Sequence, residues 1–483
     1  MPLKSKKQDP ALTQIEEMTE QKKTGIWDDD PRNPYNWPTV WKAHQVLMVA
    51  SAAFTTSIGV SIMSPAQNQL MEEFGVGSTV AILPLSVYAF ALGLGPVLGG
   101  PISETFGRLP VYLGSTLLGS VFTIGVGFSR SFSALCILRF LAGFCFAPSL
   151  AVAAGTVNEV FRPEKRAIPA TVCILTPFLG PGLGPVLGSL LVSHLGWRWT
   201  QWTILFSASV TLITMIGTRE TFHTTIMHRH SEDFYLPLSS PLSGSAKLKL
   251  FATTSIFLPI RMLVTEPIVA FICLYVACGF AILFSLFAAV PLVFQEVYMF
   301  GTENSGLAFL SIVVGCLLGT LTLLLCDILL YRRKALCYSG QQVPPEFRLY
   351  PSLIGSLTIP VSLFWFGWSA RQDISWASPI LAIMLFAWGN LCVFVSSAQY
   401  IVDTYHGSIV ASAMSANSLA RYGLAAVFPL FTIQMYTNLG SEWASSLLGF
   451  ITVAIMPFPW VLFLRGDSLR AMSKLTLAQD QDQ

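Results

Sequence analysis

The segment Gly100–Pro110, with the sequence GPISETFGRLP, is a short polar turn between two long apolar runs. The runs cover residues 80–99 and 111–129, and each has close to the ~20 residues that a helix needs to cross a bilayer. The turn holds one acidic residue, Glu104, and one basic residue, Arg108. The segment therefore predicts two membrane-spanning helices joined by a tight, charged turn.

The residues of this turn indicate how the chain reverses. Gly100 and Gly107 allow a tight reversal at positions where a Cβ atom would clash. Glu104 and Arg108 are four residues apart, a spacing that pairs them if the turn is helical. Two interpretations follow: the charges make a functional contact, or they lie on a solvated hairpin and only fix the topology.

The whole chain has the composition of a polytopic membrane protein. Of its 483 residues, 53% are hydrophobic and 11% are charged, and the mean hydropathy is +0.61. A soluble globular protein carries about 25% charged residues. The net charge of +2 and the absence of a basic run with interleaved aromatics argue against nucleic-acid binding. The nine cysteines form no CxxC pair or Cys/His ligand spacing, so we predict no metal site and no cofactor.

Apolar runs of similar length recur along the chain and predict about twelve membrane helices. They lie at residues 44–66, 80–99, 111–129, 133–157, 168–193, 200–217, 267–292, 305–330, 351–369, 377–400, 408–432 and 443–464. A polar stretch separates two sets of six, the layout of a transporter built from two halves. The predicted organisation is an N-terminal tail at 1–43, a six-helix bundle at 44–217, a linker at 218–265, a second bundle at 266–464 and a C-terminal tail at 465–483.

The basic residues test this topology independently. With both termini in the cytosol, 23 of the 28 Lys and Arg residues fall on the cytosolic side. Only Arg130, Arg198 and Arg371 fall on the opposite side. This bias is what the positive-inside rule predicts, so we expect both termini and the linker to be cytosolic.

With this layout, the turn at Gly100–Pro110 resembles the signature G-x-x-x-[DE]-x-x-G-R between the second and third helices of the major facilitator superfamily. The resemblance implies an all-α membrane fold of two six-helix bundles. It also implies that Glu104 and Arg108 act as a gate, latching the two halves at the cytoplasmic face. Leu109 stands where a second basic residue is common, which weakens the expected latch.

The predicted fifth span carries a second family resemblance. Its repeated Gly-Pro pairs resemble the antiporter signature G-x-x-x-G-P-x-x-G, which implies export. Gly180, Gly184 and Gly188 share one face of the helix and permit close packing, while Pro185 makes the helix bendable. We therefore assign these four residues a conformational role, the alternative being a merely well-packed helix.

Two arginines lie within predicted spans, where a charge is costly and marks a functional site by default. Arg139 opens an R-x-x-x-G pattern that resembles the fourth-helix motif of the family, whose arginine is tied to substrate or proton coupling. Arg139 also lies near the outer end of its span, so snorkelling to the interface is the alternative. Arg421 lies halfway along its span, and we predict a functional or helix-bridging role for it.

Other candidate cavity residues are polar or aromatic side chains near the middle of spans. They are Tyr88, Tyr275, Phe284, Phe287, Trp388, Asn390 and Asn417. A single aromatic residue in such a helix is more often part of the core or faces lipid. A large aromatic-lined cavity with few polar anchors would suit bulky amphipathic ligands.

The acidic residues bear on the choice of substrate, because those near the spans lie at span ends. They are Glu104, Glu159, Glu266, Asp327 and Asp403. A polycation such as spermine needs buried acids to replace its hydration. The sequence therefore favours neutral or anionic organic compounds over polyamines. It leaves Glu159, Glu104 and His44, in that order, as candidate proton carriers.

Together these features predict a secondary active exporter of drugs, toxins or secondary metabolites, coupled to protons and working by alternating access. Two alternatives stay open: a polyamine:proton antiporter, and an uncoupled facilitator or importer of a small organic solute. No HExxH, GxSxG or GxxxxGK[ST] pattern is present, so we predict neither an enzyme nor a nucleotide-driven pump. The expected partners are a small-molecule substrate, protons and the lipid bilayer. We expect a monomer in the cell membrane, with the vacuolar membrane as the alternative.

Overall fold

The computed structural model describes residues 27, 29–162, 165–229, 257–338, 343–405 and 408–471, and these form helices and no strand. Most of the predicted N-terminal tail, most of the predicted linker and most of the predicted C-terminal tail lie outside the described residues.

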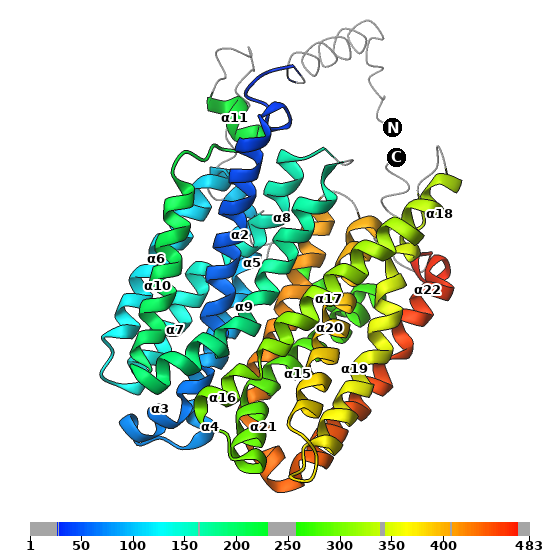
Figure 1. Ribbon diagram of the computed structural model, residues 1–483. Coiled ribbons are helices and arrows are strands. Elements are labelled where there is room, and N and C mark those ends of the chain that lie inside the picture. Colours follow the sequence, from blue (N-terminus) through cyan, green and yellow to red (C-terminus); the bar gives the residue numbers. More distant parts are fainter. Residues whose placement is uncertain are drawn as a thin grey trace, which may run out of the picture.

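The first half of the chain, coloured blue to green in Figure 1, forms one bundle. Its long helices are α2 (Thr39–Ser61), α5 (Leu83–Phe106), α6 (Arg108–Gly127), α7 (Phe132–Phe146), α8 (Pro148–Val160), α9 (Ala167–His194) and α10 (Arg198–Met215). Its shorter helices are α3 (Gln67–Phe74), α4 (Ser78–Ala81) and α11 (His223–Arg229), with 3₁₀ turns η1 (Pro34–Asn36) and η2 (Ser64–Ala66). Helices α7 and α8 form a single membrane segment, interrupted where Pro148 lacks a backbone N–H.

The second half, coloured green to red, forms the other bundle. Its long helices are α15 (Pro267–Tyr298), α17 (Leu310–Cys326), α19 (Tyr350–Ser369), α20 (Ala377–Thr404), α21 (Ser408–Ile455) and α22 (Pro457–Arg470). Its shorter elements are α14 (Leu258–Thr265), α16 (Thr302–Leu307), the π-helical turn η5 (Asp327–Tyr331), α18 (Arg332–Cys337) and the 3₁₀ turn η6 (Pro345–Leu349).

Within the described residues, ten segments are long and apolar enough to cross a membrane. One of these ten segments, Ile409–Arg470, contains two helices. They are separated at Gly440, whose φ of 77° and ψ of 163° are not helical. Helix α10, with 18 residues, completes the first bundle but lies outside that count. When α10 is included and Ile409–Arg470 is divided at Gly440, the ten segments become the expected twelve helices. The predicted all-α membrane class is therefore confirmed.

Small residues let helices of the first bundle pack closely. A Cβ atom at Gly180 would lie 2.1 Å from Ser57 Oγ, and one at Gly188 would lie 2.1 Å from the carbonyl oxygen of Ile62. At Gly184 the nearest atom, at 2.0 Å, is also in α2. The predicted glycine face of the fifth span is therefore the surface on which α9 packs against α2 of the same half.

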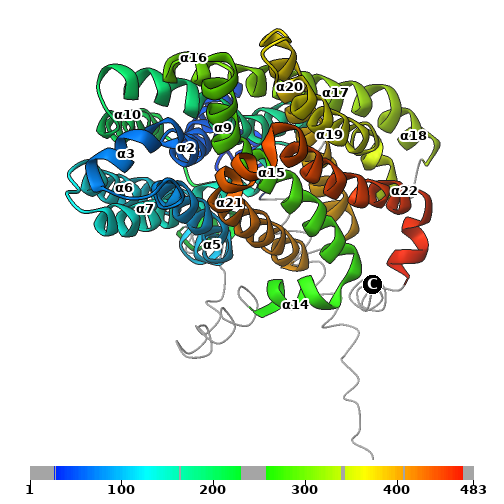
Figure 2. The same ribbon diagram turned by 90° about the horizontal axis from the view of Figure 1, so that it is seen from below.

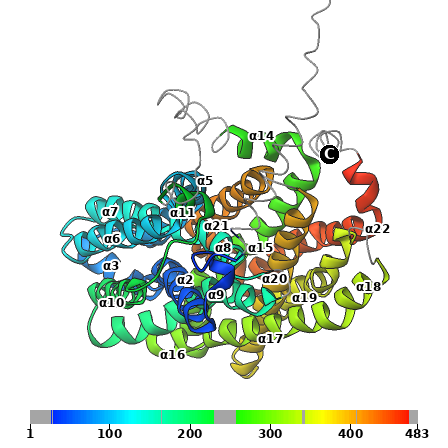
Figure 3. The same ribbon diagram turned by 90° about the horizontal axis from the view of Figure 1, so that it is seen from above.

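The two bundles lie side by side and meet along a limited set of helices. Figures 2 and 3 show α5 beside α21 and α9 beside α16 and α17. Gly93 of α5 packs against Tyr422 and Ser418 of α21, and Gly182 of α9 packs against Val313 of α17. The interface between the halves thus also depends on residues without side chains.

Candidate transport site

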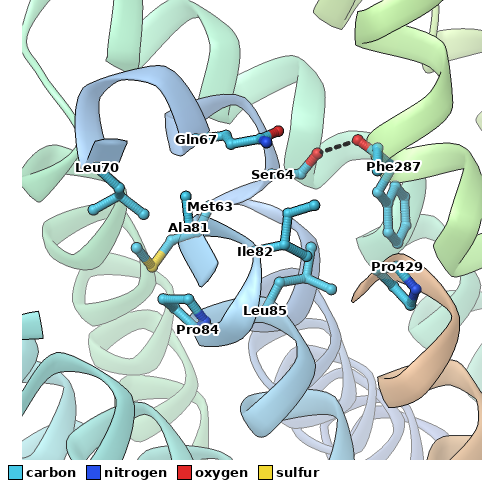
Figure 4. Close-up of a pocket in the computed structure, with 11 residues that line it drawn as sticks. Met63, Ser64, Gln67, Leu70, Ala81, Ile82, Pro84, Leu85, Phe287 and Pro429 are labelled. Carbon is cyan, nitrogen blue, oxygen red and sulfur yellow. Dashed lines mark hydrogen bonds between the residues drawn. The ribbon is translucent and has the colours of Figure 1, made fainter. Parts of the chain in front are cut away.

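Three polar contacts between described residues join the two halves. They connect Ser64 with Phe287, Thr79 with Gln434 and His194 with Glu303. The first is a hydrogen bond of 2.9 Å from the serine hydroxyl to the phenylalanine carbonyl oxygen (Figure 4). Helices α4 and α16, which carry Thr79 and Glu303, lie at the end of the bundles opposite α11 and α18 (Figure 1). That end of the interface is therefore closed.

A small cavity lies at this closed end, beneath α3 and beside α15 (Figure 4). Its volume of about 10 Å³ is close to the minimum that holds one water molecule. It is lined by Met63, Ser64, Gln67, Leu70, Ala81, Ile82, Pro84, Leu85, Phe287, Ala288 and Pro429. Phe287, a predicted cavity residue, thus lines a space too small for an organic substrate.

The opposite end of the first bundle carries an ion pair centred on Arg108. Its Nη2 atom lies 2.7 Å from Oε1 of Glu159 at the end of α8, and its guanidinium lies 4.7 Å from the ring centroid of Phe222. The predicted Glu104–Arg108 pair does not form in the described structure, because the helix breaks between them at Gly107, where φ is 98°. Glu104 is exposed instead.

The two glycines of this turn differ in their surroundings. Gly107 adopts a backbone conformation that favours glycine, and a Cβ atom there would lie 2.4 Å from Oε2 of Glu220. Gly100 lies within α5, and a Cβ atom there would contact nothing within 4 Å. The reversal therefore depends on Gly107, and the predicted role of Gly100 in it was wrong.

Glu220 closes this cluster from the segment that follows α10. Its carboxylate accepts hydrogen bonds from the backbone N–H groups of Arg108 (2.8 Å) and Leu109 (3.1 Å), which begin α6. It also accepts from the N–H groups of Thr221 (3.0 Å) and Phe222 (2.9 Å). The buried carboxylate thus caps helix α6, whose first N–H groups have no partner inside the helix.

The second bundle carries a comparable cluster at the same end. Arg348 donates from Nε to Oδ2 of Asp403 at 2.8 Å, and its guanidinium lies 3.7 Å from the ring centroid of Tyr331. A second pair joins Arg470 to Glu346. Among the described residues, every ion pair at this end joins residues of one half. No described ion pair fastens the two halves together there.

Arg139 is fully engaged inside the first bundle. Its side chain is 1% exposed, and it donates to the carbonyl oxygens of Gly59 at 2.7 Å and Pro84 at 3.4 Å. Its guanidinium lies 4.3 Å from the ring centroid of Tyr88, whose hydroxyl donates to the carbonyl oxygen of Thr56. Arg139 therefore links α7 to α2 and α5, and it does not snorkel.

Arg421 has a different environment in the second bundle. Its guanidinium lies 4.6–4.7 Å from the ring centroids of Phe280, Phe394 and Tyr422, and we call these three rings the aromatic cage. Its Nε atom is buried and has no hydrogen-bond partner. Phe178 of α9, in the first half, packs against Phe280 and Phe394 at centroid distances of 5.5 and 5.1 Å. The cage thus lies where the halves meet.

Of the remaining predicted cavity residues, Phe284 packs against Tyr422 of the aromatic cage and against Phe287, at centroid distances of 6.5 and 5.3 Å. Tyr275, Phe284 and Asn390 are buried. Trp388 is half-buried and donates to Thr322 Oγ1 between α17 and α20. Asn417 is 2% exposed, and its Nδ2 atom has no hydrogen-bond partner.

Sequence reasoning missed two groups of residues that the structure places together. The aromatic cage and Phe178 were not among the candidates, although Phe280 lies four residues before the predicted Phe284 on the same helix face. Glu220 was missed because it lies in the polar segment read as a linker. Its position next to Arg219 and Thr221 gives no signal that its carboxylate caps a distant helix.

A comparison with known families gives a match to the model of the Major Facilitator Superfamily over residues 49–429. This chain belongs to the major facilitator superfamily. The match covers most of the chain, and it confirms the resemblance that the turn at Gly100–Pro110 suggested. The chain is therefore a membrane transporter and not an enzyme.

Several curated transporters resemble this superfamily member along most of its length. Polyamine transporter 4 of Saccharomyces cerevisiae is 35% identical over 94% of this chain and 73% of its own. MFS-type transporter traF of Penicillium crustosum is 35% identical over 93% of both chains. The major facilitator superfamily multidrug transporter mdrA of Aspergillus fumigatus is 35% identical over 94% of this chain and 76% of its own.

A solved structure supports the fold alone. A POT family transporter in complex with 5-aminolevulinic acid matches with a TM-score of 0.64 over 89% of this chain and 97% of its own. The sequence identity is 13%. The match supports the fold described above, and it gives no information about the substrate of this chain.

Proposed function

We propose that this major facilitator superfamily member is a proton-coupled exporter of amphipathic organic compounds that works by alternating access. The observation that carries the proposal is the asymmetry of the interface between the halves. Among the described residues, polar contacts join the halves at one end, while the ion pairs at the other end stay within each half. An interface that is closed at one end and has no described ion pair between the halves at the other suits a rocking transporter.

The direction of transport rests on topology and on α9. If the termini are cytosolic, as the basic residues predict, the unfastened end faces the cytosol, where an exporter collects its substrate. Helix α9 holds Pro177, Pro181 and Pro185 between two packing surfaces, α2 of its own half and α17 of the other. Each proline removes one backbone hydrogen bond, so this helix can bend as the halves rock.

The cluster around Arg108 is the proposed cytoplasmic gate. Glu104 is exposed there and free to meet the second half when that end closes. Glu159 is the proposed proton carrier, because a proton on its carboxylate would weaken its bond to Arg108. Opening and closing of the gate would then follow protonation. We place the protein as a monomer in the cell membrane, with the vacuolar membrane as the alternative.

Polyamine export is the second candidate, favoured by the similarity to Polyamine transporter 4. The distribution of charge argues against it. Among the described residues, no Asp or Glu lies near the middle of a membrane-spanning helix, whereas Arg421 does and Arg139 is buried within another. A polyamine entering this interior would meet positive charge without a counter-charge.

The test is efflux from proteoliposomes that contain the full-length protein. A panel of neutral and anionic fluorescent amphipathic compounds and labelled spermidine would be compared with and without an imposed proton gradient. Gradient-dependent efflux of the fluorescent compounds, but not of spermidine, is the expected result. Efflux that ignores the gradient would contradict proton coupling and support the facilitator. Gradient-driven efflux of spermidine would support the polyamine candidate instead.

A further inference from the structure

We propose that Arg421 and Asn417 form an anion-binding site at the centre of the transporter, and that its substrates are aromatic carboxylates whose rings stack in the aromatic cage. This inference rests on the proposed function and narrows its substrate class. It begins from one feature of the interior: Arg421 is a half-buried cation with a buried Nε atom, and the described residues supply rings but no acceptor for its guanidinium.

The three cage rings compensate the charge of Arg421 only in part. Cation–π contacts act on the face of the guanidinium, while its five N–H groups point outward in its plane and need acceptors. None of the hydrogen bonds between described residues uses Arg421 as a donor, and no described Asp or Glu forms an ion pair with it. A buried donor without an acceptor is unfavourable, so an acceptor that reaches the Nε–H group binds here with an advantage.

Asn417 lies one helical turn before Arg421 and adds a second unused donor. Its side chain is 2% exposed, and its Nδ2 atom is buried without a partner. Residues four apart on a helix lie on the same face. The guanidinium and the amide therefore offer several N–H donors to one ligand. A carboxylate matches them, because it has only acceptors and can accept two parallel bonds from a guanidinium.

Part of the Arg421 side chain stays exposed, although rings from α15 and α20 lie against its guanidinium. Met414 and Ser418, which precede it at helical spacing on α21, are also half-buried. The carbonyl oxygen of Ser418 would lie 3.5 Å from a Cβ atom at Gly93 of the first half, so this part of α21 lies at the interface between the halves.

Phe178 connects the site to both halves. It belongs to α9 of the first half, and its ring packs against Phe280 and Phe394 of the second. An aromatic ligand held by Arg421 would enter between rings that belong to different halves. Its binding would therefore change the contact between the halves, which is what coupling to alternating access requires. The aromatic rings therefore favour a ligand with an aromatic ring, and the N–H donors of Arg421 and Asn417 favour one with a negative charge.

The test uses three probes that share one ring system. Binding of 2-naphthoate, neutral 2-naphthamide and (2-naphthylmethyl)ammonium to the purified full-length protein would be measured by isothermal titration calorimetry. The carboxylate is expected to bind at least about 10-fold more tightly than the amide, the ratio for one charge-assisted contact, and the ammonium is expected to bind most weakly. Equal affinities for the carboxylate and the amide would overturn the inference.

Variants locate the preference at Arg421. Arg421→Met is expected to lower the affinity for 2-naphthoate to that for the amide, while Arg421→Lys keeps a reduced preference because it retains the charge but not the planar fork. Arg130→Gln, at an exposed arginine far from the site, is the matched control and should bind like the unchanged protein. A carboxylate preference that survives Arg421→Met would overturn the assignment. If that variant does not fold, the Arg421→Lys variant and the three probes decide the question.

The outcome separates this inference from the proposed function. Gradient-driven efflux of neutral fluorescent compounds, without a carboxylate preference in binding, overturns the anion site and leaves the exporter standing. A carboxylate preference at Arg421, without gradient-driven efflux of any compound, supports the anion site and contradicts the exporter.

Discussion

Arg139 and Arg421 are the two arginines inside the membrane-spanning helices, and the structure gives them opposite surroundings. Arg139 donates to two backbone carbonyl oxygens and lies against one tyrosine ring. Arg421 lies among three rings and has no hydrogen-bond acceptor in the described part of the chain. A buried charge with acceptors holds helices together, whereas a donor without a described acceptor can bind a ligand. This difference is the basis for proposing a structural role for Arg139 and a binding role for Arg421.

The largest expected effect comes from removing the satisfied charge. Arg139→Met should lower the free energy of unfolding by about 3 kcal/mol, because it removes charge-assisted hydrogen bonds and a buried cation–π contact that link α7 to α2 and α5. Thermal unfolding of the purified variant, followed by tryptophan fluorescence, measures this. A variant as stable as the unchanged protein would show that Arg139 is not structural and would remove the contrast with Arg421.

Removing Arg421 should cost less. Arg421→Met is expected to lower the free energy of unfolding by less than Arg139→Met does, because it removes contacts with three rings but no hydrogen bond between described residues, and it also removes the buried Nε donor that has no described acceptor. The same unfolding measurement, run beside Arg139→Met, gives the difference. A loss of stability as large as that of Arg139→Met would mean that Arg421 has a structural role after all.

Glu220 extends the comparison to a third buried charge, which is satisfied by four backbone N–H groups. Glu220→Gln keeps the shape but removes the negative charge at the first turn of α6, so it should lower the free energy of unfolding by about 1 kcal/mol. Glu104→Gln, at an exposed carboxylate on the same turn, is the matched control for stability. If both variants unfold alike, the cap contributes nothing.

The smallest effect concerns the hydroxyl groups of the two flanking tyrosines. Tyr88→Phe keeps the ring beneath Arg139 but loses the hydrogen bond to Thr56, which should reduce stability by about 1 kcal/mol. Tyr422→Phe keeps the ring beside Arg421 and should change both stability and 2-naphthoate affinity little. A large loss of affinity in Tyr422→Phe would show that its hydroxyl, and not its ring, serves the site.

The sequence predicts the membrane helices well because the length of an apolar run is a property of the chain itself. The orientation of the termini, inferred from the basic residues, stays a prediction. The expected span at 377–400 corresponds to α20, and that at 351–369 corresponds to α19 within one residue. The Glu104–Arg108 pair was wrong because its spacing assumes a continuous helix, and the left-handed Gly107 breaks it. The gating and domain assignments stay predictions.

Local sequence does not distinguish the two buried arginines. Both stand in apolar helices, and both appear in the sequence as costly charges. Their difference comes from which distant groups the fold brings near: the carbonyl oxygens of Gly59 and Pro84 for one, and aromatic rings for the other. Only the three-dimensional arrangement shows which charge is satisfied.

The measurement that tests this contrast most directly is the shift in apparent melting temperature that a saturating concentration of 2-naphthoate causes in three proteins. These are the unchanged protein, Arg139→Lys and Arg421→Met. A ligand at 100 times its dissociation constant stabilises the folded state by about 2.7 kcal/mol. We expect 2-naphthoate to raise the melting temperature of the first two proteins and to leave that of Arg421→Met unchanged. An equal rise in Arg421→Met would contradict the assignment of Arg421 as the anion-binding residue.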